Sequence, residues 1–283
     1  MENTTVNLVG AGRVGQTLLG LLRSMPNYTV QDVVSARLAS AQDAVAAAGT
    51  GHAVESVADM RPAHLWILAI PDTEIKSVAQ MLSEAFAGKG TVDPAPVAVH
   101  CSGFFAAEEM APLRSLGWHL ASAHPVLSFS EPAVAMTQFN GIYCGVEGDA
   151  AALEVVRPLY AAMGAHLFDI QSDRKSLYHA AAVISNNFTV VLQALAQEAW
   201  ASAGVSDEVA RRLNATLINA TAENVIAQGP KAALTGPAAR GDTSVVKQQG
   251  QDLAKWHPAA GAVYALLSVM AGNLKTNGTT RGG

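Results

Sequence analysis

Three glycines near the N-terminus are spaced as a phosphate-binding turn requires. Gly10, Gly12 and Gly15 form the pattern G-x-G-x-x-G directly after an apolar segment and before a helical one. In a dinucleotide site the first glycine permits a tight turn, the second lets the backbone approach the pyrophosphate, and the third lets the helix pack on the strand. The N–H groups that open the helix, at Arg13 and Val14, then bind the phosphates with the help of the helix dipole. The motif therefore predicts a dinucleotide site.

The end of the second expected strand, residues 28–35, indicates which dinucleotide binds. NAD-specific sites usually carry an acidic residue roughly 20 positions beyond the glycines, which binds the ribose 2′-hydroxyl. Ser35 stands there instead, and Arg37 follows two residues later, where its guanidinium suits a 2′-phosphate. We therefore expect NADP rather than NAD. Two alternatives stay open: Asp32 binds the ribose from mid-strand, or Arg37 only faces solvent.

Ligands of open α/β sheets bind outside the carboxyl ends of the strands. The residues at the ends of three further expected strands are therefore candidates for the binding site. A buried apolar strand ends at Ile70 and Pro71, which are expected to wall the cofactor cleft or simply to end the strand. The next strand leads to Ser102, whose hydroxyl suits a carboxamide or a substrate oxygen. Another ends at His124, which is either a proton donor or a structural histidine.

A long helix expected over residues 173–203 carries polar side chains in an apolar setting. His179 and Asn186 are seven residues apart and share a face, with Asn187 slightly off it. Buried histidine and asparagine need hydrogen-bond partners. The functional interpretation is that asparagine holds a substrate carbonyl or amine while His179 donates a proton. The alternative is a polar network between helices.

The order of the segments predicts two domains. Strands and helices alternate at first, which predicts a Rossmann-like α/β domain with a doubly wound parallel sheet over residues 1–171. Only helical segments follow, so residues 172–275 are expected to form an all-helical domain for substrate binding and dimerisation. The tail, 276–283, is expected to be disordered. In the helical part, Arg240 suits a substrate carboxylate, or it pairs with Asp242 and stiffens its own loop.

Composition narrows the classes of partner. The chain has 283 residues, 50% of them hydrophobic and 14% charged, and a net charge of -5, so it can bury a core but offers no basic stripe for nucleic acid. The apolar stretches are too short to cross a bilayer. Cys101 and Cys144 form no metal-ligand spacing and no disulfide framework, which is typical of a reducing compartment. With no signal-like segment before the first strand, we expect a cytoplasmic protein without a metal.

Six motifs, taken in order, resemble one family across nearly the whole chain. They are Gly10-Ala-Gly-Arg-Val-Gly15, Ile70-Pro-Asp72, His100-Cys-Ser-Gly103, His124-Pro125, Tyr178-His-Ala-Ala-Ala182 with Asn187, and Leu234-Thr-Gly-Pro-Ala-Ala-Arg-Gly-Asp242. The family comprises predicted oxidoreductases with an N-terminal Rossmann-like domain and a C-terminal helical domain of unknown function. It is similar to pyrroline-5-carboxylate reductases, ketopantoate reductases and the 6-phosphogluconate dehydrogenase superfamily. The resemblance implies NADP bound between the domains and a homodimer formed through the helical domain.

The resemblance also implies a reaction. Relatives of known chemistry reduce a C=O or C=N bond beside the nicotinamide, and some use a helix lysine four residues before an asparagine. Val183 stands at that position here, so the proton would come from His179 or from water.

We therefore expect an NADPH-dependent reductase of a small carboxylated 2-oxo acid, such as ketopantoate, or of an imine. The alternative is a non-catalytic NADP-binding protein that reports redox state to a partner. The expected catalytic residues are His179, Asn187, His124 and Ser102, and the expected substrate ligands are Asn186 and Arg240.

Overall fold

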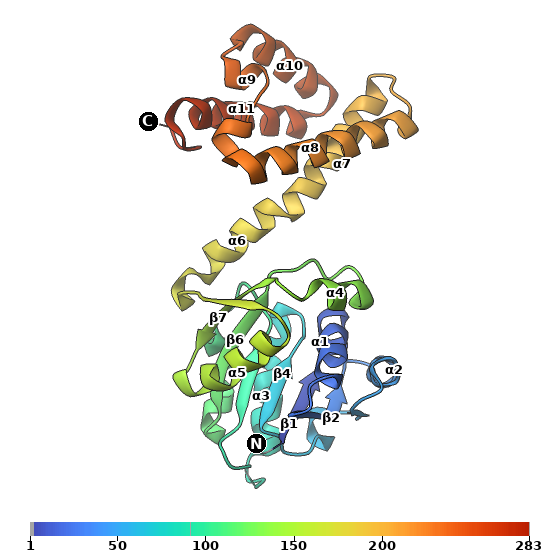
Figure 1. Ribbon diagram of the computed structural model, residues 1–283, viewed down its shortest axis with the longest axis vertical. Helices are drawn as coiled ribbons and strands as arrows, with labels where there is room; N and C mark the ends of the chain where they lie inside the picture. The colour runs from blue at the N-terminus through green and yellow to red at the C-terminus, as the bar shows by residue number, and fades with distance from the viewer. Residues whose placement is uncertain (1–2, 91, 283) are drawn as a thin grey trace. The chain divides into compact units, whose positions relative to one another are not determined.

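The computed structural model describes residues 3–90 and 92–282, and its contacts divide the chain into two compact units, Met1–Ile184 and Ser185–Gly283 (Figure 1). The division therefore falls later than the boundary at residue 172 that the sequence suggested. The reason lies in helix α6 (Lys175–Ser185), whose first turns pack on the sheet of the first unit. Lys175 is fully buried there, and Tyr178 hydrogen-bonds a strand residue.

The first unit is built on an eight-stranded sheet in the order β3-β2-β1-β4-β5-β6-β7-β8. Its strands are β1 (Thr4–Val9), β2 (Tyr28–Val34), β3 (His52–Ala53), β4 (Leu65–Leu68), β5 (Val97–His100), β6 (His119–Pro125), β7 (Tyr143–Gly148) and β8 (His166–Asp169). Neighbouring strands pair in parallel except β6 and β7, which are antiparallel. The doubly wound sheet expected from the sequence is thus confirmed with one exception. The chain returns from β6 through helix α4 (Pro132–Gln138) without a crossover, and such a connection gives an antiparallel pair.

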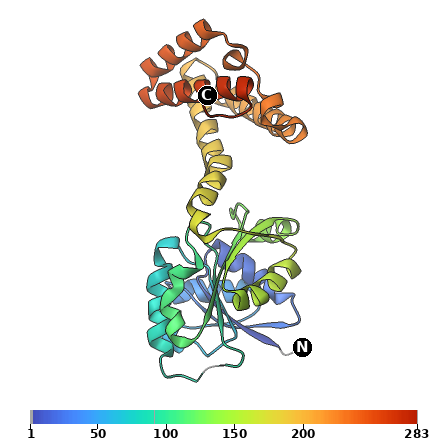
Figure 2. The same cartoon turned by 90° about the vertical axis from the view of Figure 1, so that its left-hand side faces the viewer.

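Helices cover both faces of this sheet (Figures 1 and 2). Helices α1 (Arg13–Arg23), α2 (Leu38–Ala48) and α5 (Ala150–Ala162) pack on one face, and α3 (Ile75–Phe86) with the 3₁₀ segment η3 (Ala107–Leu116) packs on the other. Strand β4 shows why its sequence is continuously apolar: Leu65 and Ile67 belong to one buried cluster, whereas Trp66 and Leu68 belong to the other.

The strand order places the glycine turn at the usual ligand position of such folds. From β1 the sheet continues to β2 on one side and to β4 on the other, so the order reverses between β1 and β4. The turns after these two strands lie side by side, because Gly10 follows β1 and contacts Ala69 and Ile70, which follow β4. Open α/β sheets bind ligands in the crevice at this switch point.

The second unit is helical. Its helices are α7 (Asn187–Ser202), α8 (Asp207–Ala233), α9 (Pro237–Arg240), α10 (Thr243–Trp256) and α11 (Pro258–Asn277). The expected breaks at Gly229 and before Pro258 are both present, and Gly229 has a φ of 75°.

Two expectations about the helical part need correction. The long helix expected over 173–203 is divided at Asn186, a turn residue with φ −111° and ψ −69° between α6 and α7. The expected disordered tail, 276–283, begins inside α11, which ends at Asn277, and Gly283 lies outside the described residues.

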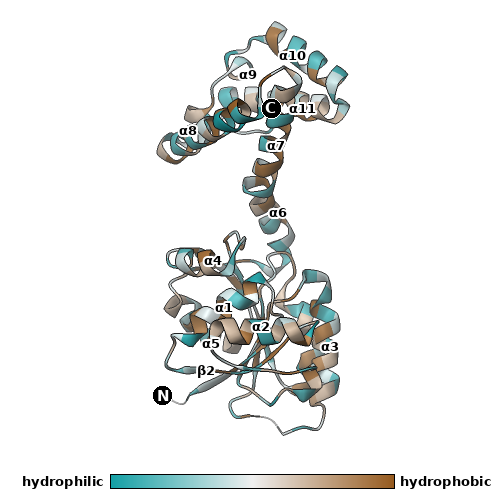
Figure 3. Cartoon of the chain, turned by 90° about the vertical axis from the view of Figure 1, so that its right-hand side faces the viewer, coloured by the Kyte–Doolittle hydropathy of each residue, from teal (hydrophilic) through white to brown (hydrophobic). Residues whose placement is uncertain are grey.

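Large apolar side chains lie exposed on this unit, among them Val190 at 65%, Leu217 at 53% and Ile226 at 84% exposure. Hydrophobic segments are visible along α7 and α8 in Figure 3. Within residues 3–90 and 92–282, none of the helices has the length and apolar character needed to cross a membrane.

Candidate functional site

The three glycines of the turn have the separate roles that their spacing predicts. Gly10 has a φ of +103°, and a Cβ there would lie 2.3 Å from the carbonyl oxygen of Ala69. A Cβ on Gly15 would lie 2.0 Å from the carbonyl oxygen of Gly10, so only glycine lets α1 approach β1. Gly12 differs, because no atom of the described residues lies within 4 Å of the place where its Cβ would stand. The fold requires the first and third glycines, whereas the second faces open space of the kind a pyrophosphate needs.

The N-terminus of α1 supplies donors toward that space. Gly12 is its N-cap, and no side chain in the described part of the chain caps the helix. The first N–H groups of a helix have no partner within the helix and bind anions when exposed. Arg13 is exposed and Val14 half-buried, while the Gln16 side chain donates to the carbonyl oxygen of Ala11 at 2.9 Å and holds the turn. These residues fit a dinucleotide diphosphate.

The end of β2 favours NADP over NAD. The Ala11 N–H donates to Ser35 Oγ at 3.4 Å, so this hydroxyl lies beside the glycine turn. Arg37 is exposed at the start of α2. The carboxylate of Asp32 is buried and forms an ion pair with Arg61 at 2.6 Å, so its oxygens already have a partner within the protein. The alternative in which Asp32 binds the ribose is therefore not supported.

The loop after β5 is fixed by its own hydrogen bonds. His100 donates from Nε2 to the carbonyl oxygen of Ala106 at 3.0 Å and accepts at Nδ1 from the Ser102 N–H at 3.1 Å. Burial lowers the pKa of His100 to about 4, so the ring is neutral at pH 7. Ser102 Oγ accepts from the N–H groups of Phe104 and Phe105 at 3.1 and 3.0 Å. The Ser102 oxygen thus holds the loop, and only its hydroxyl hydrogen is available to a ligand.

Two histidines and a tyrosine meet beside this loop. His124 Nδ1 lies 2.8 Å from the hydroxyl of Tyr178, and the rings of His124 and His179 are 5.7 Å apart at 80°. A Cβ on Gly103 would lie 2.6 Å from His179 and 2.9 Å from His124 Nε2, so both rings lie close to the loop at Gly103 and leave no room for a side chain there. Burial is the main cause that lowers the pKa of His124 to about 4, with smaller effects from His179 and Lys175.

With its pKa lowered to about 4, His124 is neutral at pH 7. Burial raises the pKa of Tyr178 to about 12, so its phenol keeps its proton. When this hydroxyl donates to Nδ1 of His124, the ring hydrogen stands on Nε2, on the side of Gly103. The arrangement offers a neutral hydrogen-bond donor and, behind it, a phenol able to replace a transferred proton.

A buried ion pair, which the sequence did not reveal, lies under the loop. Lys175 is 1% exposed and donates from Nζ to the carbonyl oxygen of Ser102 at 2.9 Å and to the hydroxyl of Ser122. Glu147 Oε1 lies 3.6 Å from this ammonium and accepts from the Ala107 N–H at 2.7 Å. Burial lowers the pKa of Lys175 to about 8 against the opposing attraction of Glu147.

The structure thus brings Ser102, His124 and His179 together in the first unit. The other predicted site residues on the helical side lie in the second unit. Asn186 and Asn187 are exposed where α7 begins. Arg240 pairs with Asp242 at 2.9 Å, as its structural interpretation predicted.

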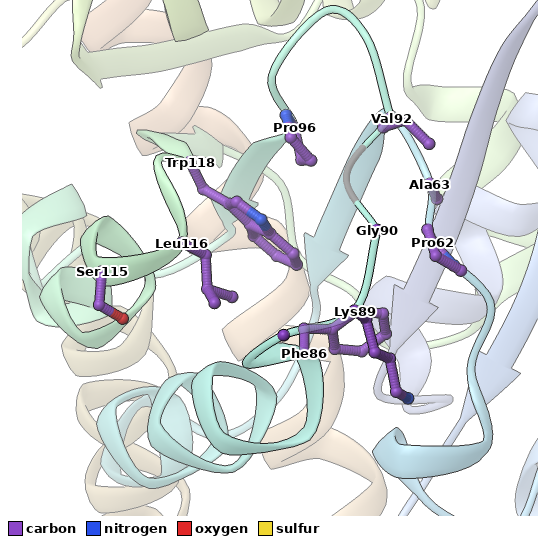
Figure 4. A pocket seen from close by; sticks show the side chains of 11 residues that line it. Pro62, Ala63, Phe86, Lys89, Gly90, Val92, Pro96, Ser115, Leu116 and Trp118 are labelled. Atoms are coloured by element: carbon purple, nitrogen blue, oxygen red, sulfur yellow. The ribbon is translucent and has the colours of Figure 1, made fainter.

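A cavity of about 200 Å³ lies at the other edge of the sheet and is separate from this site (Figure 4). It is lined by Ala63, Pro96 and Trp118, which precede β4, β5 and β6, so it faces the amino ends of the strands. Phe86 and Lys89 close its remaining side.

Two domain families match the sequence. Residues 2–125 match the family described as Rossmann-like domain, and residues 142–270 match the family described as domain of unknown function DUF2520. The chain is thus similar to a Rossmann-like domain over its first part and to a DUF2520 domain over its second. No curated protein matches its sequence.

Solved structures share the fold of this chain over almost its full length. Protein TM1727 from Thermotoga maritima is 27% identical, with 96% of this chain and 99% of that chain covered and a TM-score of 0.75. A provisionally assigned NADP oxidoreductase, BF3122 from Bacteroides fragilis, is 24% identical, with 96% and 98% covered and a TM-score of 0.75. A pyrroline carboxylate reductase from Plasmodium falciparum, solved with NADP bound, is 13% identical, with 96% and 99% covered and a TM-score of 0.57. The second and third likenesses establish the fold alone.

Proposed function

We propose that this chain is an NADPH-dependent reductase that transfers hydride to the C=N or C=O bond of a small substrate. The observation that carries the proposal is the glycine turn, in which Gly10 and Gly15 are forced by packing while Gly12 alone opens onto unfilled space. A bound pyrophosphate accounts for this second glycine, which the packing of the turn does not require. The likeness in fold to an NADP oxidoreductase and to an NADP-bound reductase agrees with this ligand.

Named groups of the first unit would hold the cofactor. The N–H groups at Gly12, Arg13 and Val14 bind its pyrophosphate. Ser35 and the Arg37 guanidinium bind the 2′-phosphate. Flanking the turn on its other side, Ile70 and Pro71 form an apolar wall. NADPH, when bound, supplies the hydride, and the protein supplies binding, orientation and proton control.

The state of His124 favours an imine over a 2-oxo acid. Reduction of a carbonyl needs a proton for the new alkoxide, and a histidine with a pKa of about 4 carries no spare proton at pH 7. An imine that arrives protonated needs none, because hydride addition to an iminium gives a neutral amine. His124 then acts as a neutral donor that orients the substrate. With a 2-oxo acid such as ketopantoate, Tyr178 would have to restore a proton through His124.

The remaining predicted ligands are part of the same proposal. His179 borders the reacting bond in the first unit, and Ser102 offers its hydroxyl hydrogen to the nicotinamide carboxamide or the substrate. Asn186, Asn187 and Arg240 are proposed substrate ligands, and their alanine variants should raise KM. We also propose a homodimer formed through the helical unit, which is supported by the exposed apolar side chains of α7 and α8.

The test is a fluorescence titration with NADPH and NADH, followed by assays of NADPH oxidation with pyrroline-5-carboxylate, other cyclic imines, ketopantoate and 2-oxoisovalerate. We expect NADPH to bind more tightly than NADH and a cyclic imine to be the best substrate. Binding of NADPH without turnover of any substrate would favour a non-catalytic redox sensor. Absence of NADPH binding would overturn the proposal as a whole.

A further inference from the structure

The ion pair of Lys175 and Glu147 is the feature of the first unit that the proposed reaction leaves unused. Both side chains are almost fully buried, at 1% and 6% exposure. Burying two charges costs more than an apolar pair of the same size would, so such a pair is a poor source of stability by itself. Its place beneath the loop that lies close to His124 and His179 suggests a different role.

The pair connects the elements that carry the site. Lys175 opens α6, the helix of Tyr178 and His179, and its ammonium donates to the Ser102 carbonyl oxygen at 2.9 Å. Glu147, on β7, accepts from the Ala107 N–H at the start of η3 and from the Ser172 hydroxyl just before α6 at 2.6 Å. One charged contact therefore links the loop after β5, strand β7 and the start of α6.

The charge acts on a particular peptide group. The Ser102 carbonyl accepts from the Lys175 ammonium and also from the Ser122 hydroxyl at 3.2 Å. A trans peptide is planar, so its N–H, here that of Gly103, points away from its carbonyl. A cation at the carbonyl end polarises the whole group and fixes its plane. Gly103 is the residue whose missing Cβ leaves room for both histidine rings.

We propose that Lys175 is a positioning residue, whose ammonium, balanced by Glu147, locks the Ser102–Gly103 peptide against His124 and His179. This inference rests on the proposed reductase function for its kinetic consequence, but the lock itself does not. Loss of the ammonium frees the peptide plane, and Gly103 no longer holds the two rings at their present separation.

The lock can be observed directly by NMR. Ser102–Gly103 is the only Ser–Gly pair in the chain, so a protein made with carbonyl-¹³C serine and ¹⁵N glycine gives a single carbonyl–amide cross-peak. Cell-free synthesis avoids the conversion of serine into glycine. The test variant is K175M/E147Q, which removes both charges and leaves no buried charge unpaired. The control is K76M, which removes an exposed lysine of α3.

We expect the cross-peak to move in K175M/E147Q and to keep its wild-type position in K76M, with circular dichroism showing that both variants are folded. A cross-peak at the wild-type position in folded K175M/E147Q would overturn the lock. This result does not depend on turnover, so it stands even when no substrate is found and the proposed function fails.

Kinetics then test the consequence with the best substrate. In K175M/E147Q we expect kcat to fall by about 100-fold, the loss that a misplacement of about 1 Å in an active site causes. The KM of the substrate and the affinity for NADPH stay unchanged, because neither contact involves the pair. An equal kcat in K175M/E147Q and K76M would show that Lys175 positions nothing in the reaction.

Discussion

Gly12 and Gly15 are three residues apart, yet substitution by alanine should have opposite effects on folding and on cofactor binding. A Cβ on Gly12 meets no atom of the described residues within 4 Å, and its φ of −75° suits any residue. We expect G12A to change the free energy of unfolding by no more than about 1 kcal/mol, since reduced freedom of the unfolded chain offsets a slightly poorer N-cap. The same methyl group occupies the space of the pyrophosphate. Loss of one hydrogen bond to a charged group, about 1.5–3 kcal/mol, weakens NADPH binding by about 10- to 140-fold.

G15A should instead destabilise the folded protein. Its Cβ would lie 2.0 Å from the Gly10 carbonyl oxygen and 3.3 Å from Leu8 Cδ2, and a backbone oxygen cannot turn aside as a flexible side chain can. Overpacking of this kind costs about 1–3 kcal/mol. At roughly 2–4 °C per kcal/mol, Tm should fall by about 2–12 °C.

The assay pairs a thermal melt without ligand with a fluorescence titration with NADPH for each variant. Wild-type affinity in a well-folded G12A, or a Tm of G15A equal to that of wild type, would refute this interpretation of the turn.

Three further outcomes follow from the first unit. R37A should bind NADPH about tenfold or more weakly and NADH with unchanged affinity, because the Arg37 guanidinium contacts only the 2′-phosphate. Equal losses of affinity for both cofactors would contradict this role. D32N should destabilise the fold by about 1.5–3 kcal/mol, measured by urea unfolding, through its lost bonds with Arg61. The ratio of NADPH to NADH affinity should stay constant in D32N. A changed ratio would indicate that Asp32 does bind the ribose of the cofactor. Stability should also fall as pH drops from 6.5 toward 4, since burial lowers the pKa of both His100 and His124 to about 4 and the unfolded chain binds protons first. The loss approaches about 1.4 kcal/mol per pH unit for each histidine, so H124N should remove about half of it and leave the part due to His100. Equal urea midpoints at pH 7 and pH 5 would contradict this expectation.

The sequence predicts well those features of the fold and the site that short segments determine. A glycine turn between an apolar strand and a helix depends on residues within one continuous stretch, and Gly10, Gly12 and Gly15 have the geometry that their spacing indicates. Strand β4 is apolar throughout because both of its faces are buried, so its position is visible in the sequence, although it ends at Leu68, two residues before the predicted end at Ile70. Because consecutive parallel strands end at one edge, even the neighbourhood of Ser102 and His124 follows from local patterns.

Features that depend on long-range packing are not predicted. Glu147 and Lys175 are in contact although 28 positions separate them, and neither position carries a recognisable motif. A signal was nevertheless present, because a carboxylate inside the otherwise apolar end of β7 needs a buried partner. The direction of β7 depends on the path of the chain through α4, and the hydrophobic periodicity of the sequence does not indicate that path. The break at Asn186 is a single change of backbone angle within a continuous helical pattern.

The most direct test of the central claim is a crystal structure of the chain with NADPH. The account predicts the pyrophosphate within hydrogen-bond distance of the N–H groups at Gly12, Arg13 and Val14, with the 2′-phosphate beside Ser35 and Arg37. Cofactor bound elsewhere, or a glycine turn without cofactor at saturating NADPH, would contradict it.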